Sequence, residues 1–119
     1  MKMKALVLGF LLWVTIPALA IAADTPLNCV TGPLEKTFGN TPWLVYSCDD
    51  RQTLIVITAS GSPATPFVFS FYKKDGAYQL HGEGTGRKDL TDAAYKELGV
   101  LTEARIKALI QQTHSVRAK

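Results

Sequence analysis

The sequence has few of the residues on which enzyme and metal chemistry most often depend. Its 119 residues include two histidines and two cysteines, and no G-x-S-x-G, G-x-G-x-x-G or phosphate-loop motif occurs. Hydrolytic catalysis needs a nucleophile, a base and an orienting group, and a metal centre needs several converging ligands. We therefore expect no catalytic residue, no metal and no cofactor, and we interpret the chain as non-enzymatic.

Long apolar runs are also scarce. Only one stretch approaches the roughly 20 apolar residues that span a membrane, and it lies at the N-terminus. Two lysines precede it, Pro17 interrupts it, and small residues lead up to Ala23, an order typical of a secretory signal peptide. We expect residues 1–22 to be removed and residues 23–119 to form a single small domain.

Two alternatives to this cleavage remain open. Cleavage after Ala20 or Ala23 is nearly as compatible with the small residues of the segment. An uncleaved membrane anchor is the other alternative, and Gly9, Thr15 and Pro17 make it less favourable because they interrupt the apolar run. With the leader removed, we expect a periplasmic or secreted protein without a membrane span.

The expected mature domain has almost no excess of charge of either sign. The whole chain has 13 basic and 10 acidic residues and a net charge of +3. Lys2 and Lys4 belong to the leader and every acid lies at Asp24 or later, so 11 basic and 10 acidic residues leave +1. Because nucleic-acid binding depends on a broad basic field, we expect no nucleic-acid partner.

Cys29 and Cys48 are the only cysteines, so they form the only pair that the chain offers. In an oxidising compartment such a pair is typically a structural disulfide, and we predict one here. The alternatives are a redox-active pair, which usually has C-x-x-C spacing, and two free thiols.

Aromatic and β-branched residues predict four strands within the domain. The expected strands are 43–48, 53–59, 66–72 and 77–83. Short connections favour an antiparallel meander, and Asp75-Gly76 is a strong hairpin signal. The most apolar strand, 53–59, is expected to be central and covered on both faces.

The residues before these strands give weaker signals. We expect a short strand at 27–31 and one helical turn at 33–38, ended by Gly39. Within the strand 66–72, Phe67, Phe69 and Phe71 share one face because strand side chains alternate. This aromatic face is the expected docking surface for helices; a ligand platform is the alternative.

Two helices are expected after Gly86, where the apolar period changes to about 3.6. Asp89 or Thr91 is the expected cap of the first helix, which ends before Gly99. Thr102 is the expected cap of the second. Its apolar stripe consists of Ile106, Leu109, Ile110 and Thr113. The predicted fold is therefore α+β: an antiparallel meander of about four strands, followed by two short C-terminal helices on one sheet face.

A glycine-rich segment, 82–88, is the one motif that suggests ligand chemistry. Glycines allow backbone N–H groups to approach a ligand, and helix N-termini favour anions. The candidate anion-binding residues are Gly84, Gly86, Arg87 and Lys88. The alternative is a flexible strand-to-helix connection.

The general layout resembles small exported proteins of Gram-negative bacteria that have no assigned activity. The resemblance rests on the leader and on W-L-V-Y-S-C-D-D at 43–50, P-F-V-F-S-F-Y at 66–72, G-E-G-T-G at 82–86 and L-T-E-A-R-I-K-A-L-I at 101–110. It spans most of the expected domain and implies export, but it implies no activity.

A shorter resemblance links L-V-Y-S-C-D-D-R-Q-T-L-I-V, at 44–56, to periplasmic inhibitors of c-type lysozyme. Those inhibitors insert a Ser-Gly-x-x-Tyr loop into the enzyme, whereas Ser60-Gly61 is followed here by Ala64 at the tyrosine position. That family is also a barrel without a helical tail, so no inhibitory residue is carried over.

Together these observations predict an exported, non-enzymatic protein that binds another envelope component, expected to be a protein. One alternative is an inhibitor of a cell-wall hydrolase or protease that acts through the loop 60–65. The other is a small-ligand or anion-binding protein that uses the segment 82–88.

Overall fold

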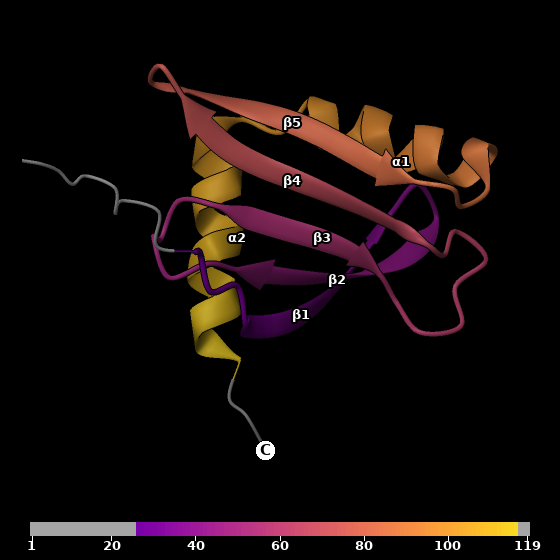
Figure 1. Cartoon of the computed structure of the whole chain (residues 1–119), viewed down its shortest axis with the longest axis horizontal. Helices are drawn as coiled ribbons and strands as arrows, with labels where there is room; N and C mark the ends of the chain where they lie inside the picture. Colours follow the sequence, from indigo (N-terminus) through magenta and orange to yellow (C-terminus); the bar gives the residue numbers. More distant parts are fainter. Residues whose placement is uncertain (1–25, 117–119) are drawn as a thin grey trace, which may run out of the picture.

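The computed structural model describes residues 26–116, and the expected leader, 1–22, lies outside them. Five strands precede two helices (Figure 1): β1 (Thr31–Phe38), β2 (Thr41–Ser47), β3 (Leu54–Thr58), β4 (Phe67–Lys74), β5 (Ala77–Gly84), α1 (Lys88–Gly99) and α2 (Glu103–Ser115). The strands form one antiparallel sheet in the order β1-β2-β3-β4-β5. The predicted α+β meander with two C-terminal helices is therefore confirmed, with one strand more than expected.

The additional strand is β1, and it corrects the prediction for the first segment. Residues 27–30 have no regular structure, and the expected helical turn at 33–38 is extended and pairs with β2. Leu34 lies opposite Val45 in this pairing, and Phe38 at the end of β1 is buried. Burial of these apolar side chains against the helices outweighs the weak local preference of the segment.

Two tight hairpins fix the register of the outer strands. Gly39 and Asn40, with φ of 60° and 61°, connect β1 and β2, and Phe38 pairs with Thr41. Asp75-Gly76 connects β4 and β5 in the same way, with φ of 54° and 81°. Two residues of positive φ form the turn that suits the twist of adjoining strands, so the Asp-Gly prediction is confirmed. At Gly39 the positive φ forms a β-hairpin, whereas the sequence predicted that Gly39 ends a helical turn.

Both helices pack against the same face of the sheet (Figure 1). The core between the layers comprises Phe38, Trp43, Val45, Leu54, Val56, Ala64, Phe69, Phe71, Ala94, Leu98, Ile106, Leu109 and Ile110. Phe69 and Phe71 are buried in this layer, and Tyr95 of α1 stacks on Phe69 with 6.3 Å between ring centroids. The prediction that the phenylalanine face receives the helices is confirmed, although Phe67 is only half-buried.

The second helix follows its prediction closely, whereas the first begins earlier than expected. The Thr102 hydroxyl accepts a hydrogen bond from the Arg105 backbone N–H at 3.2 Å, and all four residues of the predicted stripe of α2 are buried. Helix α1 begins at Lys88, so Asp89 and Thr91 lie in its first turn and neither caps it. Asp89 there has the sign that the helix N-terminus favours.

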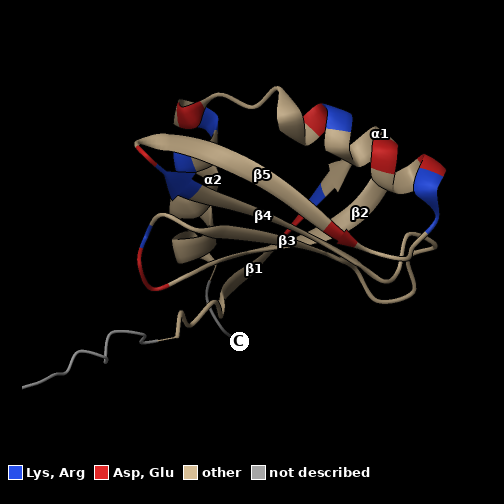
Figure 2. Ribbon diagram, turned by 45° about the horizontal axis from the view of Figure 1, so that its top comes forward, with Lys and Arg blue, Asp and Glu red and all other residues tan. Residues whose placement is uncertain are grey.

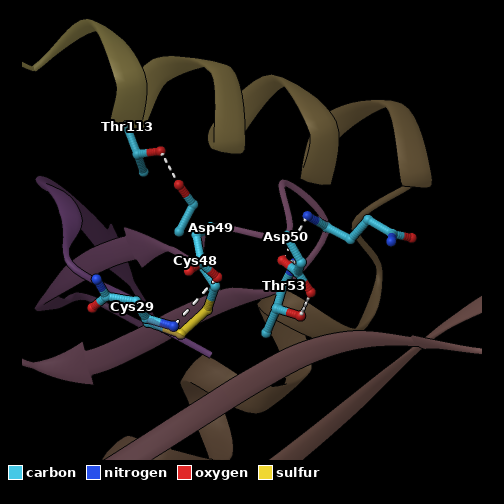
Figure 3. Close-up of a disulfide and its surroundings, with 9 residues drawn as sticks. Cys29, Cys48, Asp49, Asp50, Thr53 and Thr113 are labelled. Carbon is cyan, nitrogen blue, oxygen red and sulfur yellow. Dashed lines mark hydrogen bonds between the residues drawn. A yellow bond between two sulfur atoms is a disulfide. The ribbon is translucent and has the colours of Figure 1, made fainter. Parts of the chain in front are cut away.

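Cys29 and Cys48 form the predicted disulfide (Figure 3). The bridge joins the segment before β1 to the end of β2. The hydroxyl groups of Ser47 and Thr113 lie 2.7 Å apart beside it, both in buried residues, and link β2 to α2. Among residues 26–116, no helix is long and apolar enough to cross a membrane.

Candidate functional site

The central strand β3 is covered on one face only, which corrects the prediction of two covered faces. Leu54 and Val56 point toward the helices and are fully buried. The side chain of Ile57 points to the opposite face and is 39% exposed. Within the described part of the chain both helices occupy the same side, so the most apolar strand has an uncovered surface.

This uncovered face has a continuous apolar surface, which we call the open-face patch. It consists of Leu44, Tyr46, Ile55, Ile57, Val68 and Tyr72. Leu44, Ile57 and Val68 are paired across three adjacent strands, and Tyr46 is paired with Ile55. Side chains directly opposite each other on neighbouring strands lie about 4.5–5.5 Å apart at Cβ, so these residues form one surface.

Two carboxylates lie at the ends of the patch. The row of Leu44, Ile57 and Val68 continues to Glu35 on β1 and to Glu83 on β5, and both glutamates are exposed. Figure 2 shows that β2 and β3 carry no charged residue, while charges cluster on α1 and at the turns. The row therefore has an apolar centre with an acidic group at each edge strand, and Lys74, which shares the face of Tyr72, adds a cation at the β4–β5 hairpin.

Three polar side chains on this face resemble part of a catalytic arrangement. Ser70 lies opposite His81, and His81 Nε2 is 3.4 Å from Glu83 Oε1. The imidazole and carboxylate are 59% and 77% exposed, so water competes for this contact. Stabilisation of a developing charge needs preorganised donors in a water-excluded site, and this exposed sheet surface is a poor setting for such chemistry.

The predicted anion-binding segment lies at the β5–α1 connection, and its glycines pack against another loop. The backbone N–H groups of Thr85 and Gly86 donate to Pro66 O at 3.1 and 2.9 Å. A Cβ atom at Gly86 would lie 1.7 Å from Ala64 O, and one at Gly84 would lie 2.4 Å from Pro66 O. These glycines allow close approach of the loop before β4, and the two N–H groups already have an acceptor.

The two predicted cations of this segment each pair with an acid of α1. Arg87 contacts both carboxylate oxygens of Asp89, and Lys88 Nζ lies 3.3 Å from Asp92. The hydrogen bonds that Arg87 donates to Asp89 raise the pKa of Arg87 and lower the pKa of Asp89. An incoming anion would compete with these exposed carboxylates for Arg87 and Lys88, and anion binding at Gly84, Gly86, Arg87 and Lys88 stays a prediction.

Comparison of the chain with protein-family models, with curated proteins and with solved structures finds no match in any of the three. Among residues 26–116, no group of three or more His, Cys, Asp or Glu side chains could hold a metal ion.

The loop 60–65, which is the basis of the inhibitor alternative, is held by its own hydrogen bonds. Ser62 Oγ accepts from the Ala64 N–H at 3.1 Å, and the Thr65 N–H donates to Ser62 O. Ser62 and Ala64 are buried, whereas Ser60 and Gly61 are exposed at the tip. The tip is thus presented on a well-anchored base.

Sequence reasoning missed the open-face patch because it expected the most apolar strand, 53–59, to be covered on both faces. The signal was present in β2, where Trp43 and Val45 alternate with Leu44 and Tyr46. Alternation of this kind normally places polar residues on the solvent side. Apolar residues at both parities therefore indicated two apolar faces, but only the tertiary structure shows that a single face receives the helices.

Proposed function

We propose that this chain is an exported, non-enzymatic binding protein whose partner is another protein of the cell envelope. The open-face patch carries the proposal. Monomeric proteins rarely expose continuous apolar surfaces of this kind without a function, and such surfaces commonly mark interaction sites. The disulfide supports export because such bonds persist in oxidising compartments.

The acidic ends of the patch define the kind of partner that fits. In an aligned face-to-face pair of this chain, the rows that end in Glu35 and Glu83 would bring carboxylates together. Anionic lipid surfaces would also repel these groups. A protein surface with an apolar centre and Lys or Arg at its rim complements both features.

Ile57 and Tyr72 are the most exposed residues of the patch. They are 39% and 38% exposed, so completing their burial contributes about 1 kcal/mol each. The other four residues of the patch are already half-buried and contribute less. Replacing Ile57 by Asp would place a charge at the centre of the contact and abolish binding.

Site-specific photo-crosslinking in the envelope tests this proposal. A crosslinker at position 57 is expected to give one discrete adduct, and one at position 100 to give none. Val100 is the matched control because it is an apolar residue, 79% exposed, in the α1–α2 connection. In a pull-down with the tagged chain, the Ile57→Asp variant should fail to capture the partner, whereas the Val100→Asp variant should still capture it. Equal capture by both variants, or no adduct at position 57, would rule out this surface.

Charge reversal tests the chemistry of the partner. Glu35→Lys and Glu83→Lys should weaken capture, and the effect should diminish at high salt because exposed charges are screened. Asp92→Lys on α1 is the control, since Asp92 lies away from the open face. Tighter capture by the two reversed variants would indicate an acidic partner and contradict the proposed rim.

A hydrolase inhibitor is the second candidate, and the anchored loop 60–65 is the observation that favours it. A loop held by its own hydrogen bonds loses little entropy when it enters an active site. Residual lysozyme or protease activity should then fall with excess of this chain and recover with Ser60→Trp, which enlarges the exposed tip without the positive φ of Gly61. Unchanged hydrolase activity would remove this candidate.

A further inference from the structure

A concave site lies on the covered side of the sheet, between the β2–β3 turn and α2. Its volume is about 240 Å³, and its lining residues are Arg51, Lys107, Ile110, Gln111 and His114. The α2 residues are spaced at i, i+3, i+4 and i+7, so they share one face of the helix. The lining brings together two permanent cations, an imidazole and an amide, and includes no acid.

The turn that carries Arg51 is unusually well fixed (Figure 3). Beside the disulfide, the Asp49 N–H donates to Asn28 O at 2.9 Å. The Asp50 carboxylate accepts from the backbone N–H groups of Gln52 and Thr53 and from the Thr53 hydroxyl. The carboxylate of Asp50 is thus directed into the turn, and the turn needs little reorganisation to present Arg51.

Arg51 itself has an unfavourable backbone conformation for its type. Its φ is 59°, in the left-handed region that Gly and Asn adopt at much lower cost. The Arg51 N–H donates to Cys48 O at 3.0 Å, which closes the turn. A glycine would satisfy the same geometry without strain, so the guanidinium can be removed at this position without disturbing the turn.

The positive charge of Lys107 is only partly compensated. Glu103 Oε2 lies 3.3 Å from Lys107 Nζ but 2.9 Å from Lys73 Nζ. The hydrogen bonds from Lys73 and then Lys107 lower the pKa of Glu103, so one carboxylate is shared by two ammonium groups. The group of three carries a net positive charge, and Lys107 is the member that lines the site.

The partial negative charge at the C-terminus of α2 disfavours a bound anion, but its effect is smaller than that of the two cations. A helix C-terminus carries about −0.5 elementary charge, and the effect is confined to the last turn. Arg51 and Lys107 contribute two full charges, and Lys107 lies two turns before the end of α2 at Ser115. The net field at the site therefore favours an anion.

We propose that this site binds the phosphate group of a small phosphorylated ligand. The planar guanidinium of Arg51 can donate two parallel hydrogen bonds to a phosphate, and Lys107, Gln111 and His114 add further donors. A volume of about 240 Å³ is slightly below that of drug-sized pockets, and it suits a phosphate with a small attached group. The site lies on the helix side of the sheet and is independent of the open-face patch.

Amide NMR shifts test the location of the site. The ¹⁵N-labelled chain, purified after export with its own leader, is titrated with inorganic phosphate at constant ionic strength. Saturable shifts are expected at Arg51, Lys107, Gln111 and His114. Shifts confined to residues 84–88, or no saturable shift, would overturn the proposal.

Variants test the chemistry of the site. Arg51→Gly removes the guanidinium and suits the φ of 59°, and Lys107→Gln removes the ammonium group. Each should weaken phosphate binding at least tenfold, whereas Lys88→Gln should leave it unchanged. Lys88 is the matched control because it too pairs with an acid four residues away on a helix. Unchanged phosphate affinity in the folded Arg51→Gly protein would overturn the proposal.

Two ligands separate a free phosphate ester from a lipid headgroup. Saturation by glycerol 3-phosphate without sedimentation on vesicles indicates a soluble ester. Arg51-dependent sedimentation with phosphatidic acid vesicles, and none with phosphatidylcholine vesicles, indicates a headgroup. If the chain binds neither glycerol 3-phosphate nor phosphatidic acid vesicles, the proposal is overturned. Ile57→Asp should leave phosphate binding intact, so failure of the protein-binding function is recognised separately.

Discussion

Replacing Gly86 by Ala tests whether the glycine-rich segment is a packing device. The added Cβ would lie 1.7 Å from Ala64 O, and a Cβ essentially never lies closer than 3.0 Å to such an atom. The two segments would have to separate by about 1.3 Å. The clashing atom is a backbone oxygen of a fully buried residue, so no flexible side chain can move aside to relieve the clash.

The size of the effect follows from the contacts that would be lost. The Thr85 and Gly86 N–H groups would move away from Pro66 O, at a cost of about 1 kcal/mol for each hydrogen bond. Loosened packing around Ala64 adds about 1 kcal/mol. We expect Gly86→Ala to lower the free energy of unfolding by about 2–4 kcal/mol and the Tm by about 10–25 °C.

Urea and thermal unfolding, followed by circular dichroism, measure this change, and two other glycines serve as controls. Gly99→Ala meets nothing within 4 Å and has no positive φ, so it should be neutral or stabilising by up to about 1 kcal/mol. Gly76→Ala also has open space but a φ of 81°, and it should cost about 1 kcal/mol from backbone strain alone. A Gly86→Ala protein within 0.5 kcal/mol of the wild type would refute the packing argument.

Three further predictions concern the end of the domain that contains the disulfide. Replacing Cys29 and Cys48 by Ser should cost about 3 kcal/mol, because the bridge closes a loop with a sequence separation of 19; unfolding with and without reductant checks this, and equal stabilities would contradict it. Thr113→Val leaves the buried Ser47 hydroxyl without this partner and should cost about 1–3 kcal/mol; a double-mutant cycle with Ser47→Ala should recover part of the loss, and strict additivity would contradict the coupling. Burial raises the pKa of Asp50, but the hydrogen bonds from Thr53 and Gln52 outweigh it and lower the pKa below 3.8; the ionised group therefore stabilises the fold above that pH, and its stabilisation is lost as the pH falls through the lower folded-state value. The free energy of unfolding of the wild type should exceed that of Asp50→Asn by about 0.5–1 kcal/mol at pH 7, and the two should converge toward about pH 2.

Features that depend on neighbouring residues could be predicted from the amino-acid sequence alone. The Asp75-Gly76 hairpin follows from two residues that tolerate positive φ. The α2 cap at Thr102 follows from one hydroxyl and the free N–H groups of the first turn. The disulfide followed from the small number of cysteines, since only one pairing was available.

Features that join distant segments depend on how the helices and strands pack together. Residues 33–38 form a strand because β2 and the helices offer an apolar surface, although their local preference suggested a helical turn. The uncovered face of β3 exists because α1 and α2 pack on the same side of the sheet. Arg51 meets Lys107 and His114 for the same reason, since α2 crosses beneath the β2–β3 turn. Alternation and spacing specify which side chains share a face, but the packing of helices onto the sheet decides which face is buried, because burial depends on contacts between residues far apart in the chain.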